Sequence, residues 1–213
     1  MKRLLCVGLS GLVVVLGIGW CLAGENQPPE GFAPLFGGRD LAGWEAKGDP
    51  KGKSPDGWQD HWKVAGGIIR YDGKSTNLWT RKSFSDFVLM VDWRLPARGD
   101  SGIYLRGTPK CQANIWVNPL GSGEIYGYRV DKNMPEEVRK AATPRKVADK
   151  PVGEWNRFVI TMKGDRITVE LNGEVVIENA QLPNCPKEGP IALQHHGNPV
   201  EFKNIFIKEL PAN

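Results

Sequence analysis

Polar and aromatic side chains alternate with apolar ones through residues 87–117, in a pattern that could build a binding or catalytic surface. Successive side chains of a strand point to opposite faces, so this period of two predicts three consecutive strands, each with one apolar face. The side chains opposite the apolar faces are Asp92 and Arg94 in the first strand, Tyr104 and Arg106 in the second, and Gln112, Asn114 and Trp116 in the third. If the strands pair in order, one sheet face gathers an acid, two arginines, two amides and two aromatic rings.

Two further segments are predicted to extend this polar face. A strand over residues 191–196 would add Gln194 and His196, and a strand over residues 124–128 would add Glu124, Tyr126 and Tyr128. Amides, arginine and aspartate can bind the hydroxyl groups of a sugar, while aromatic rings cover its C–H patches. The mixture therefore suits a carbohydrate better than a lipid or a nucleotide. The simpler interpretation needs no ligand: a surface ion network beside aromatic residues of the kind that strands favour.

Other catalytic and metal-binding patterns are absent from the sequence. No Cys or His spacing matches a structural zinc site, no glycine-rich loop precedes a helix, and no Gly-x-Ser-x-Gly sequence occurs. A glycosidase of the ordinary kind needs two suitably spaced carboxyl groups. The polar face supplies Asp92, with Glu124 as a second candidate, so two-carboxylate hydrolysis is poorly supported.

Many short strands separated by turn signals surround these residues. Gly66-Gly67 and Asn172-Gly173 lie between apolar runs and predict two tight hairpins. One helix is predicted over residues 135–142, with a proline in its first turn and acidic residues after it. Residues 49–59 form a predicted surface loop. The sequence therefore predicts an all-β fold, a β-sandwich with one minor helix.

The first residues have the pattern of a secretory signal peptide. Met1-Lys2-Arg3 precedes an apolar run, and a plausible cleavage point follows Ala23. We therefore expect a signal peptide over residues 1–23, a disordered lead-in over residues 24–30 and a single domain over residues 31–211, exported to the periplasm or the cell exterior. A transmembrane anchor and a lipoprotein signal at Cys21 fit less well, because glycines interrupt the run and Trp20 is bulky for a lipobox.

The net charge limits the kinds of partner that the chain can bind, and the cysteines that remain after cleavage allow one disulfide. Removing Lys2 and Arg3 with the signal peptide lowers the net charge from +4 to +2, a weak balance that argues against nucleic-acid binding. Cys111 and Cys185 remain in the mature chain, where an oxidising compartment would allow a disulfide. The sequence does not show whether their Cβ atoms meet, and it does not fix the oligomeric state. No stable membrane span is expected after cleavage.

Several blocks of residues, spread along nearly the whole mature chain, have counterparts in a known family. The blocks are Leu35-Phe36-Gly37-Gly38-Arg39-Asp40-Leu41-Ala42-Gly43-Trp44, Leu78-Trp79-Thr80, Asp92-Trp93-Arg94, Ser101-Gly102-Ile103-Tyr104-Leu105-Arg106, Pro151-Val152-Gly153-Glu154-Trp155-Asn156 and Gly189-Pro190-Ile191-Ala192-Leu193-Gln194. In these the chain resembles the 3-keto-glucoside 1,2-lyase and 3-keto-2-hydroxy-glucal hydratase domain, also described as 3-keto-disaccharide hydrolase. The resemblance implies a concanavalin A-like jelly roll, an exported bacterial protein and sugar chemistry.

Two positions depart from the family pattern. The family usually has Glu-x-Gln-Ile in its third central strand, where this chain has Gln112-Ala113-Asn114-Ile115. An Asn is common where this chain has Asp100. Either a catalytic carboxylate has moved to Asp100 or Glu124, or this branch acts on a different ligand. The alternative function is a non-catalytic carbohydrate-binding module, because a lectin-like jelly roll also serves binding alone.

The resemblance implies a reaction that begins at a ketone on C3 of a glucoside. The ketone acidifies the C2 proton, a base removes it, the C1 group leaves by β-elimination, and water adds across the double bond. His196, Asp92 or Asp100 is expected as the base. Positive charge for the enolate oxygen is expected from Arg94, from Arg106 or from a bound divalent cation. The side chains expected to bind the substrate are Tyr104, Gln112, Asn114, Trp116, Glu124, Tyr126, Tyr128 and Gln194.

Overall fold

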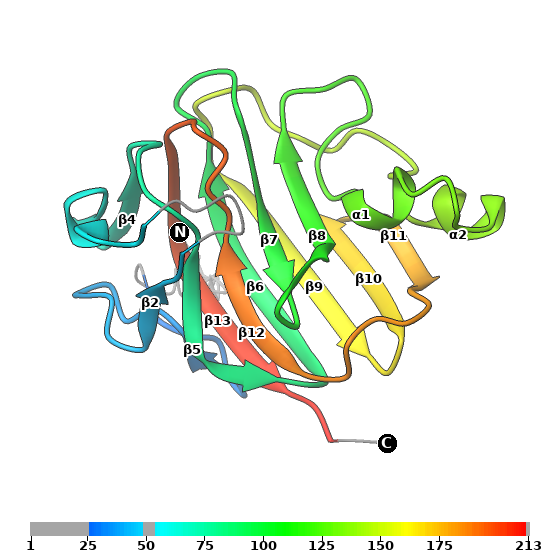
Figure 1. The fold of residues 1–213 in the computed structure, drawn as a ribbon, viewed down its shortest axis with the longest axis horizontal. Coiled ribbons are helices and arrows are strands. Elements are labelled where there is room, and N and C mark those ends of the chain that lie inside the picture. Colours follow the sequence, from blue (N-terminus) through cyan, green and yellow to red (C-terminus); the bar gives the residue numbers. More distant parts are fainter. Residues whose placement is uncertain (1–25, 49–53, 212–213) are drawn as a thin grey trace, which may run out of the picture.

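Two antiparallel β-sheets face each other in the computed structural model, which describes residues 26–48 and 54–211 (Figure 1). In spatial order the larger sheet contains β11 (Glu174–Gln181), β10 (Arg166–Leu171), β9 (Asn156–Lys163), β6 (Phe87–Arg94), β13 (Val200–Glu209), β4 (Ile68–Tyr71) and β3 (Trp62–Ala65), with β1 (Ala33–Pro34) paired to β13. The smaller sheet contains β2 (Trp44–Ala46), β5 (Leu78–Phe84), β12 (Gly189–Leu193), β7 (Asp100–Leu105) and β8 (Thr108–Trp116). The predicted β-sandwich is confirmed.

Both predicted hairpins are present. Strands β3 and β4 pair so that Ala65 lies opposite Ile68 across Gly66-Gly67. Strands β10 and β11 meet across Asn172-Gly173, whose φ angles of 55° and 85° are both left-handed. Two left-handed residues in a row make the turn whose twist matches that of paired strands, and Asn followed by Gly is the pair that adopts it at least cost. Local sequence therefore determines these two connections.

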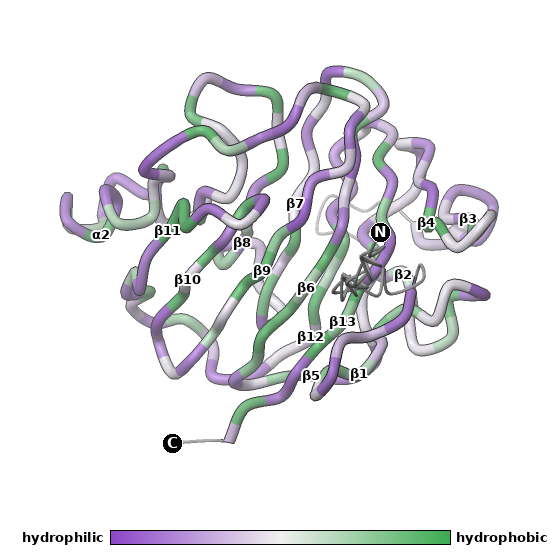
Figure 2. Tube along the Cα trace, turned by 180° about the vertical axis from the view of Figure 1, so that it is seen from behind, coloured by the Kyte–Doolittle hydropathy of each residue, from purple (hydrophilic) through white to green (hydrophobic). Residues whose placement is uncertain are grey.

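Apolar side chains from both sheets fill the space between them. Strand β6 contributes Leu89 and Val91, while β7 and β8 contribute Ile103 and Ile115, and all four are buried in one core. Figure 2 shows hydrophobic and hydrophilic residues alternating along the strands of the larger sheet. Burying one such side chain stabilises the fold by about 1.5–3 kcal/mol, so this layer holds the sheets together. Within the described ranges, no helix is long and apolar enough to cross a membrane.

Three short helical segments complete the fold. The 3₁₀ turn η1 (Trp58–Asp60) lies in the predicted surface loop, of which residues 49–53 are outside the described part. Helix α2 (Glu136–Ala141) confirms the predicted helix. Helix α1 (Tyr126–Arg129) stands where a strand over residues 124–128 was predicted, so that prediction is wrong. A Cβ on Gly127 would lie 2.6 Å from the Lys110 backbone, and this close packing of helix on strand is only open to glycine.

The predicted disordered lead-in is wrong from residue 26 onward. The backbone amide of Asn26 donates to Oδ1 of Asn204 in β13 at 2.6 Å, and the Asn204 amide donates to Oδ1 of Asn26 at 3.0 Å. The Asn26 side chain also donates to the carbonyl of Gly67 at 2.9 Å. These three hydrogen bonds tie the segment to the larger sheet. The predicted signal peptide, residues 1–23, lies outside the described residues.

Candidate functional site

The predicted polar face is divided between the two sheets. Strands β7 and β8 pair as expected, but β6 lies in the larger sheet between β9 and β13. Asp92 therefore accepts two hydrogen bonds from Arg157 on β9, at 2.5 and 2.8 Å, and one from Asn204 at 2.7 Å. Arg94 pairs with Glu201 on β13. The expectation that Asp92 and Arg94 share a face with the other candidates is wrong, because alternation fixes the face of a strand and not its neighbours.

Arg106 is also outside the predicted face. It occupies the turn between β7 and β8 with φ 51°, so its side chain no longer follows the alternation of the strand. The guanidinium is buried and donates to four oxygens: Ser85 O at 2.7 Å, Gly164 O at 2.6 Å, Pro186 O at 3.1 Å and Asp86 Oδ1 at 2.9 Å. With its donors used in this way, Arg106 is a structural residue, and the expectation that it faces a substrate is wrong.

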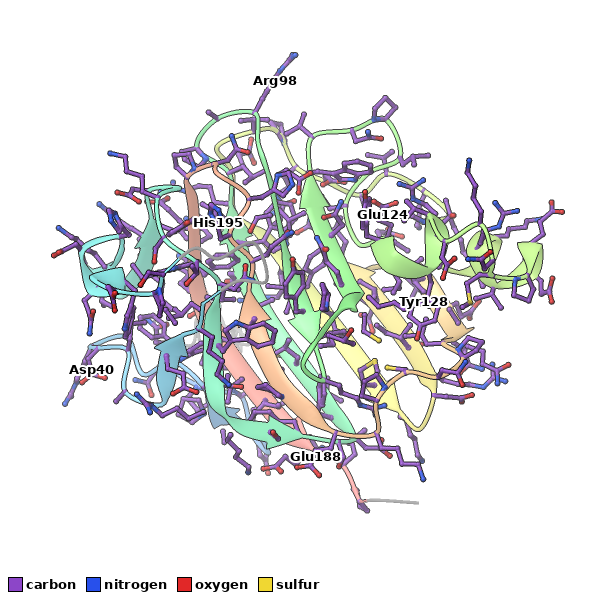
Figure 3. All side chains as sticks on the ribbon, in the orientation of Figure 1. Asp40, Arg98, Glu124, Tyr128, Glu188 and His195 are labelled. Carbon is purple, nitrogen blue, oxygen red and sulfur yellow. The ribbon has the colours of Figure 1, made fainter. Side chains whose placement is uncertain are left out.

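Neither tyrosine of α1 stands on a strand, as the predicted face required. The buried hydroxyl of Tyr128 donates to the carbonyl of Pro183 at 3.1 Å, and burial raises the pKa of this phenol. Figure 3 labels Tyr128 beneath α1, away from His195 at the other side of the smaller sheet. The ring of Tyr126 is exposed and lies 5.9 Å from the guanidinium carbon of Arg129. Helix α1 therefore takes Tyr128 into the core and leaves Tyr126 beside Arg129 at the surface.

The remaining candidates meet on the outer face of the smaller sheet, where amide side chains form a continuous row. Nε2 of Gln112 donates to Oε1 of Gln194 at 2.9 Å and to Oδ1 of Asn114 at 2.6 Å. To reach Gln194 the Gln112 side chain crosses the middle strand β7 at Gly102, where a Cβ would lie 2.4 Å from Nε2. Gln194 in turn hydrogen-bonds the hydroxyl of Tyr104. One strand position without a side chain therefore allows four polar side chains to connect.

The row ends at a buried carboxylate, Glu124. Its Oε1 accepts from Nδ2 of Asn114 at 3.1 Å, and Arg129 forms an ion pair with it. Burial raises the pKa of Glu124, and Arg129 opposes that rise. The Arg129 guanidinium also lies over the ring of Trp116, 5.7 Å from its centre. Figure 3 shows Glu124 beside α1, at the edge of the sheet.

Asp100 and His196 complete this end of the face. Nδ1 of His196 lies 3.9 Å from Oδ1 of Asp100. Burial raises the pKa of Asp100 and the charge of His196 opposes the rise, while the negative charge of Asp100 itself raises the pKa of Glu124. Two carboxylates and an imidazole are thus in electrostatic contact. Among the described residues, no group of three or more His, Cys, Asp or Glu side chains could hold a metal ion.

A cavity of about 820 Å³ opens on the same face. Three predicted residues, Tyr104, Gln194 and His196, line it. Sequence reasoning missed four other lining residues, namely Lys47, Asn77, Trp79 and His195. Trp79 was predictable, because it alternates with the buried Leu78 and Thr80 in β5 and so points outward. Its ring centre lies 5.9 Å from that of Tyr104, and the two rings form one wall.

Comparison with known proteins identifies the family of the chain. The model of one family, described as the 3-keto-alpha-glucoside-1,2-lyase-like domain, matches residues 31–208. The chain belongs to this family. The resemblance noted in the sequence is thereby confirmed, and the protein is carbohydrate-active. A 3-keto-disaccharide hydrolase from Bacteroides thetaiotaomicron is 25% identical over 235 aligned residues, which cover 85% of this chain and 79% of that protein.

Solved structures agree on the fold of this family member. A candidate glycosyl hydrolase from Parabacteroides distasonis is similar with a TM-score of 0.64 and 26% identity, over 85% of this chain and 85% of that chain. A non-specific endo-β-1,3(4)-glucanase is similar with a TM-score of 0.56 and 11% identity, over 87% of this chain and 96% of its own. The second likeness concerns the fold alone. The predicted concanavalin A-like jelly roll is confirmed.

Proposed function

We propose that this protein cleaves 3-keto-glycosides by removing the C2 proton, expelling the group on C1 and adding water to the double bond that results. One observation supports the proposal most. The cavity of about 820 Å³ lies on the polar outer face, where His196 stands beside Asp100 at one edge and Trp79 at another. Small-molecule sites usually enclose about 300–1,000 Å³, so the cavity has room for a sugar of one or two rings.

His196 and Asp100 act as the base in this proposal. At 3.9 Å the carboxylate can orient the imidazole and stabilise the imidazolium that forms when the ring takes the proton from C2. The base must accept the C2 proton and then return it to water or to the product, which a ring nitrogen of an imidazole can do. Because Asp92 lies on the other sheet, it has no part in this step.

Lys47 supplies the positive charge for the enolate oxygen. Arg94 and Arg106 are held away from the cavity, whereas Lys47 lines it; the Lys47 ammonium lies 5.9 Å from the ring centre of Trp79 and 3.2 Å from a carboxylate oxygen of Glu45. The aromatic wall can cover the C–H face of the sugar while the ammonium faces the oxygen on C3. Loss of one such preorganised charge costs about a hundredfold or more in rate.

The test is release of the C1 group from a 3-keto-glucoside by the purified protein, with and without a chelator. His196→Gln and Asp100→Asn should each lower kcat/KM by about a hundredfold or more while unfolding at the same urea concentration as the native chain. His61→Gln is a matched control, because Nδ1 of His61 also faces a carboxylate, Asp72 at 3.0 Å, but lies outside the cavity. Full activity in both His196→Gln and Asp100→Asn would remove this site.

A non-catalytic carbohydrate-binding module is the second candidate, and one observation favours it. The uncharged amide of Gln112 occupies the centre of the polar face, at the position where the sequence departs from the family pattern. Under this alternative, calorimetry would detect binding of unmodified glycans, and no keto-glucoside would be consumed.

The proposal includes export of the protein. A signal peptide that ends at Ala23 would leave a chain that begins with Gly24. Mass spectrometry of the protein recovered from the periplasm or the medium should find this N-terminus; recovery of the uncut chain from the cytoplasm alone would contradict export.

A further inference from the structure

The row of amides on the smaller sheet has a fixed direction, because a carboxylate ends it. Glu124 forms an ion pair with Arg129, and an ionised carboxylate only accepts hydrogen bonds. Asn114 therefore turns its Nδ2 toward Glu124, at 3.1 Å, and its Oδ1 toward Gln112. An amide donates at its nitrogen and accepts at its oxygen, so each amide passes this direction on to the next one.

Gln112 carries the direction across the sheet. Its Nε2 donates to Oδ1 of Asn114 at 2.6 Å and to Oε1 of Gln194 at 2.9 Å. The oxygen of Gln194 is thereby occupied, and the side chain hydrogen-bonds the hydroxyl of Tyr104 through its nitrogen. Because Tyr104 accepts at this contact, its own O–H is left to donate to another group.

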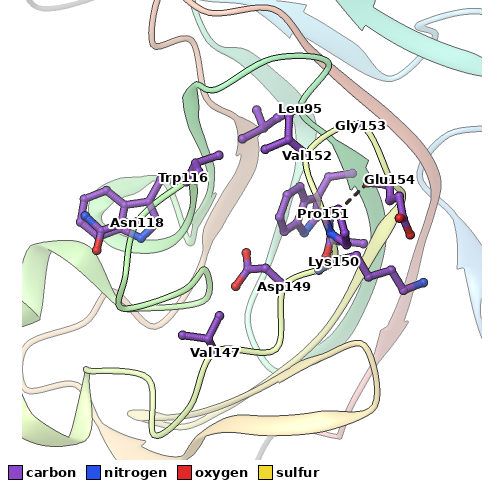
Figure 4. Close-up of a pocket in the computed structure, with 13 residues that line it drawn as sticks. Leu95, Trp116, Asn118, Val147, Asp149, Lys150, Pro151, Val152, Gly153 and Glu154 are labelled. Carbon is purple, nitrogen blue, oxygen red and sulfur yellow. Dashed lines mark hydrogen bonds between the residues drawn. The ribbon is translucent and has the colours of Figure 1, made fainter.

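The end of the row at Tyr104 opens into the larger cavity, and the end at Glu124 does not. Tyr104 and Gln194 both line the cavity of about 820 Å³. A second cavity, of about 280 Å³, contains Trp116 and Asp149 in its wall (Figure 4) but none of the side chains of the row. Glu124 itself is fully buried. A ligand in the larger cavity therefore meets the row where hydrogen bonds are donated.

Other side chains of the larger cavity are donors as well. Oδ1 of Asn77 accepts from the backbone amide of His195 at 2.7 Å, so the NH₂ group of Asn77 is the part that can bind a ligand. Lys47 adds an ammonium group, which cannot accept a hydrogen bond. Burial, and to a smaller extent the negative charge of Asp100, raises the pKa of Tyr104, so the phenol keeps its proton. Together with Gln194, four lining side chains thus donate to one cavity.

We propose that these four donors make the cavity select a ketone oxygen over a hydroxyl group, and that Gln112 is the positioning residue that sets this selection. The inference rests on the proposed function and says how a 3-keto sugar is distinguished from an unmodified one. A ketone oxygen accepts hydrogen bonds and brings no hydrogen of its own. A hydroxyl group brings a hydrogen that finds no acceptor among the four side chains, and a buried polar group without a partner costs free energy.

Replacing Gln112 by glutamate tests this direction, because the new side chain has nearly the same shape. An ionised carboxylate at position 112 accepts from the nitrogen of Gln194, whose oxygen then turns toward Tyr104. The tyrosine donates to that oxygen and no longer to the ligand. Burial favours the neutral form of a carboxyl group, so at lower pH the glutamate takes up a proton, donates, and restores the native direction. A merely structural role of Gln112 would not produce this recovery.

Binding is measured by calorimetry on the full chain with two probes that differ only at C3, 1,5-anhydroglucitol and its 3-keto derivative. The native chain should bind the ketone about tenfold or more tightly than the hydroxyl compound. Relative to the native chain at the same pH, Gln112→Glu should lose about tenfold of this preference at pH 8 and regain it at pH 5. Tyr104→Phe should lose about fivefold at both pH values, because one donor is gone. Gln59→Glu, the same substitution at an exposed residue of η1, is the matched control and should change nothing.

The outcomes separate this inference from the proposed function. Equal affinity of the native chain for the two probes, or binding of neither, would overturn the inference, as would a Gln112→Glu protein whose preference is the same at both pH values. If Gln112→Glu does not fold, the comparison of Tyr104→Phe with the native chain decides. Consumption of a 3-keto-glucoside is followed separately. A native chain that prefers the ketone probe but consumes no keto-glucoside keeps the inference and loses the proposed function, and the opposite pair of results does the reverse.

Discussion

Replacing Gly102 by alanine tests the row of amides directly. The φ angle of Gly102 is not left-handed, so the backbone conformation allows alanine, and the only conflict is the space that the added methyl group needs. That methyl group would lie 2.4 Å from Nε2, 2.8 Å from Cγ and 2.9 Å from Cδ of Gln112. Real Cβ atoms do not approach other atoms so closely. The Gln112 side chain must therefore leave its position, and its hydrogen bonds to Asn114 and Gln194 are lost.

The size of the effect follows from these two hydrogen bonds. Each contributes about 1 kcal/mol, and a buried partner left unsatisfied adds about 1–3 kcal/mol. Alanine has fewer backbone conformations than glycine in the unfolded chain, and this stabilises the folded protein by about 0.4–1 kcal/mol. The free energy of unfolding should therefore fall by about 2–5 kcal/mol, which at an m-value of about 2 kcal/mol/M lowers the urea midpoint by about 1–2 M.

Urea denaturation monitored by tryptophan fluorescence measures the change. Gly37→Ala is the matched control: no atom lies within 4 Å of its Cβ position, and its φ is not left-handed, so its midpoint should not fall. On the Gly102→Ala background, Gln112→Ala should cost much less than it does in the native chain, because the side chain is already displaced. If the Gly102→Ala protein is as stable as the native chain, the Gln112 side chain does not pass over β7 at Gly102.

Three further predictions concern stability. Arg106→Ala should lower the free energy of unfolding by about 3–5 kcal/mol, because Asp86 loses its buried partner; a loss below about 1 kcal/mol in urea would contradict the buried contacts. Burial raises the pKa of Glu124, so the folded chain binds this proton more tightly than the unfolded chain and loses stability as pH rises above about 4.3. The urea midpoint of Glu124→Gln, relative to that of the native chain, should accordingly be higher at pH 7 than at pH 4. The same difference between the two proteins at both pH values would refute this. Sγ of Cys111 and Sγ of Cys185 lie 2.8 Å apart across 74 positions of the chain, so oxidised glutathione should join them and raise the free energy of unfolding by about 3–5 kcal/mol; two thiols still titratable in the oxidised native protein would argue against it.

Local patterns predicted much of the fold. The two turns at Gly66-Gly67 and Asn172-Gly173 are set by residues that adopt left-handed φ, and the inward faces of β7 and β8 follow from alternation. The polar side chains Gln112 and Asn114 were placed on the correct face of the smaller sheet for the same reason. These features depend on residues close together in the chain, so they can be predicted from a single sequence.

Neighbour relations between distant strands were not predictable in this way. Strand β6 has the same alternation as β7, yet it pairs with β9 and β13, which moves Asp92 to the opposite side of the molecule. Arg106 sits at the turn, where alternation ends, and Tyr128 enters the core because a short helix replaces a strand. Lys47 and His195 lie in connections without a period, so no local pattern pointed to the cavity they line.

The contacts of Arg106 have a consequence for how this domain can change. Its acceptors belong to three separate connections, those before β6, between β9 and β10, and before β12. One guanidinium thus fixes the spacing of both layers at that end of the jelly roll. At the opposite end of β8, residues 119 and 120 are exposed, so an inserted peptide should be accepted there, whereas residues 163–165 would reject one. New ligand preferences can arise there by exchange of loops while the closure of the sandwich stays the same.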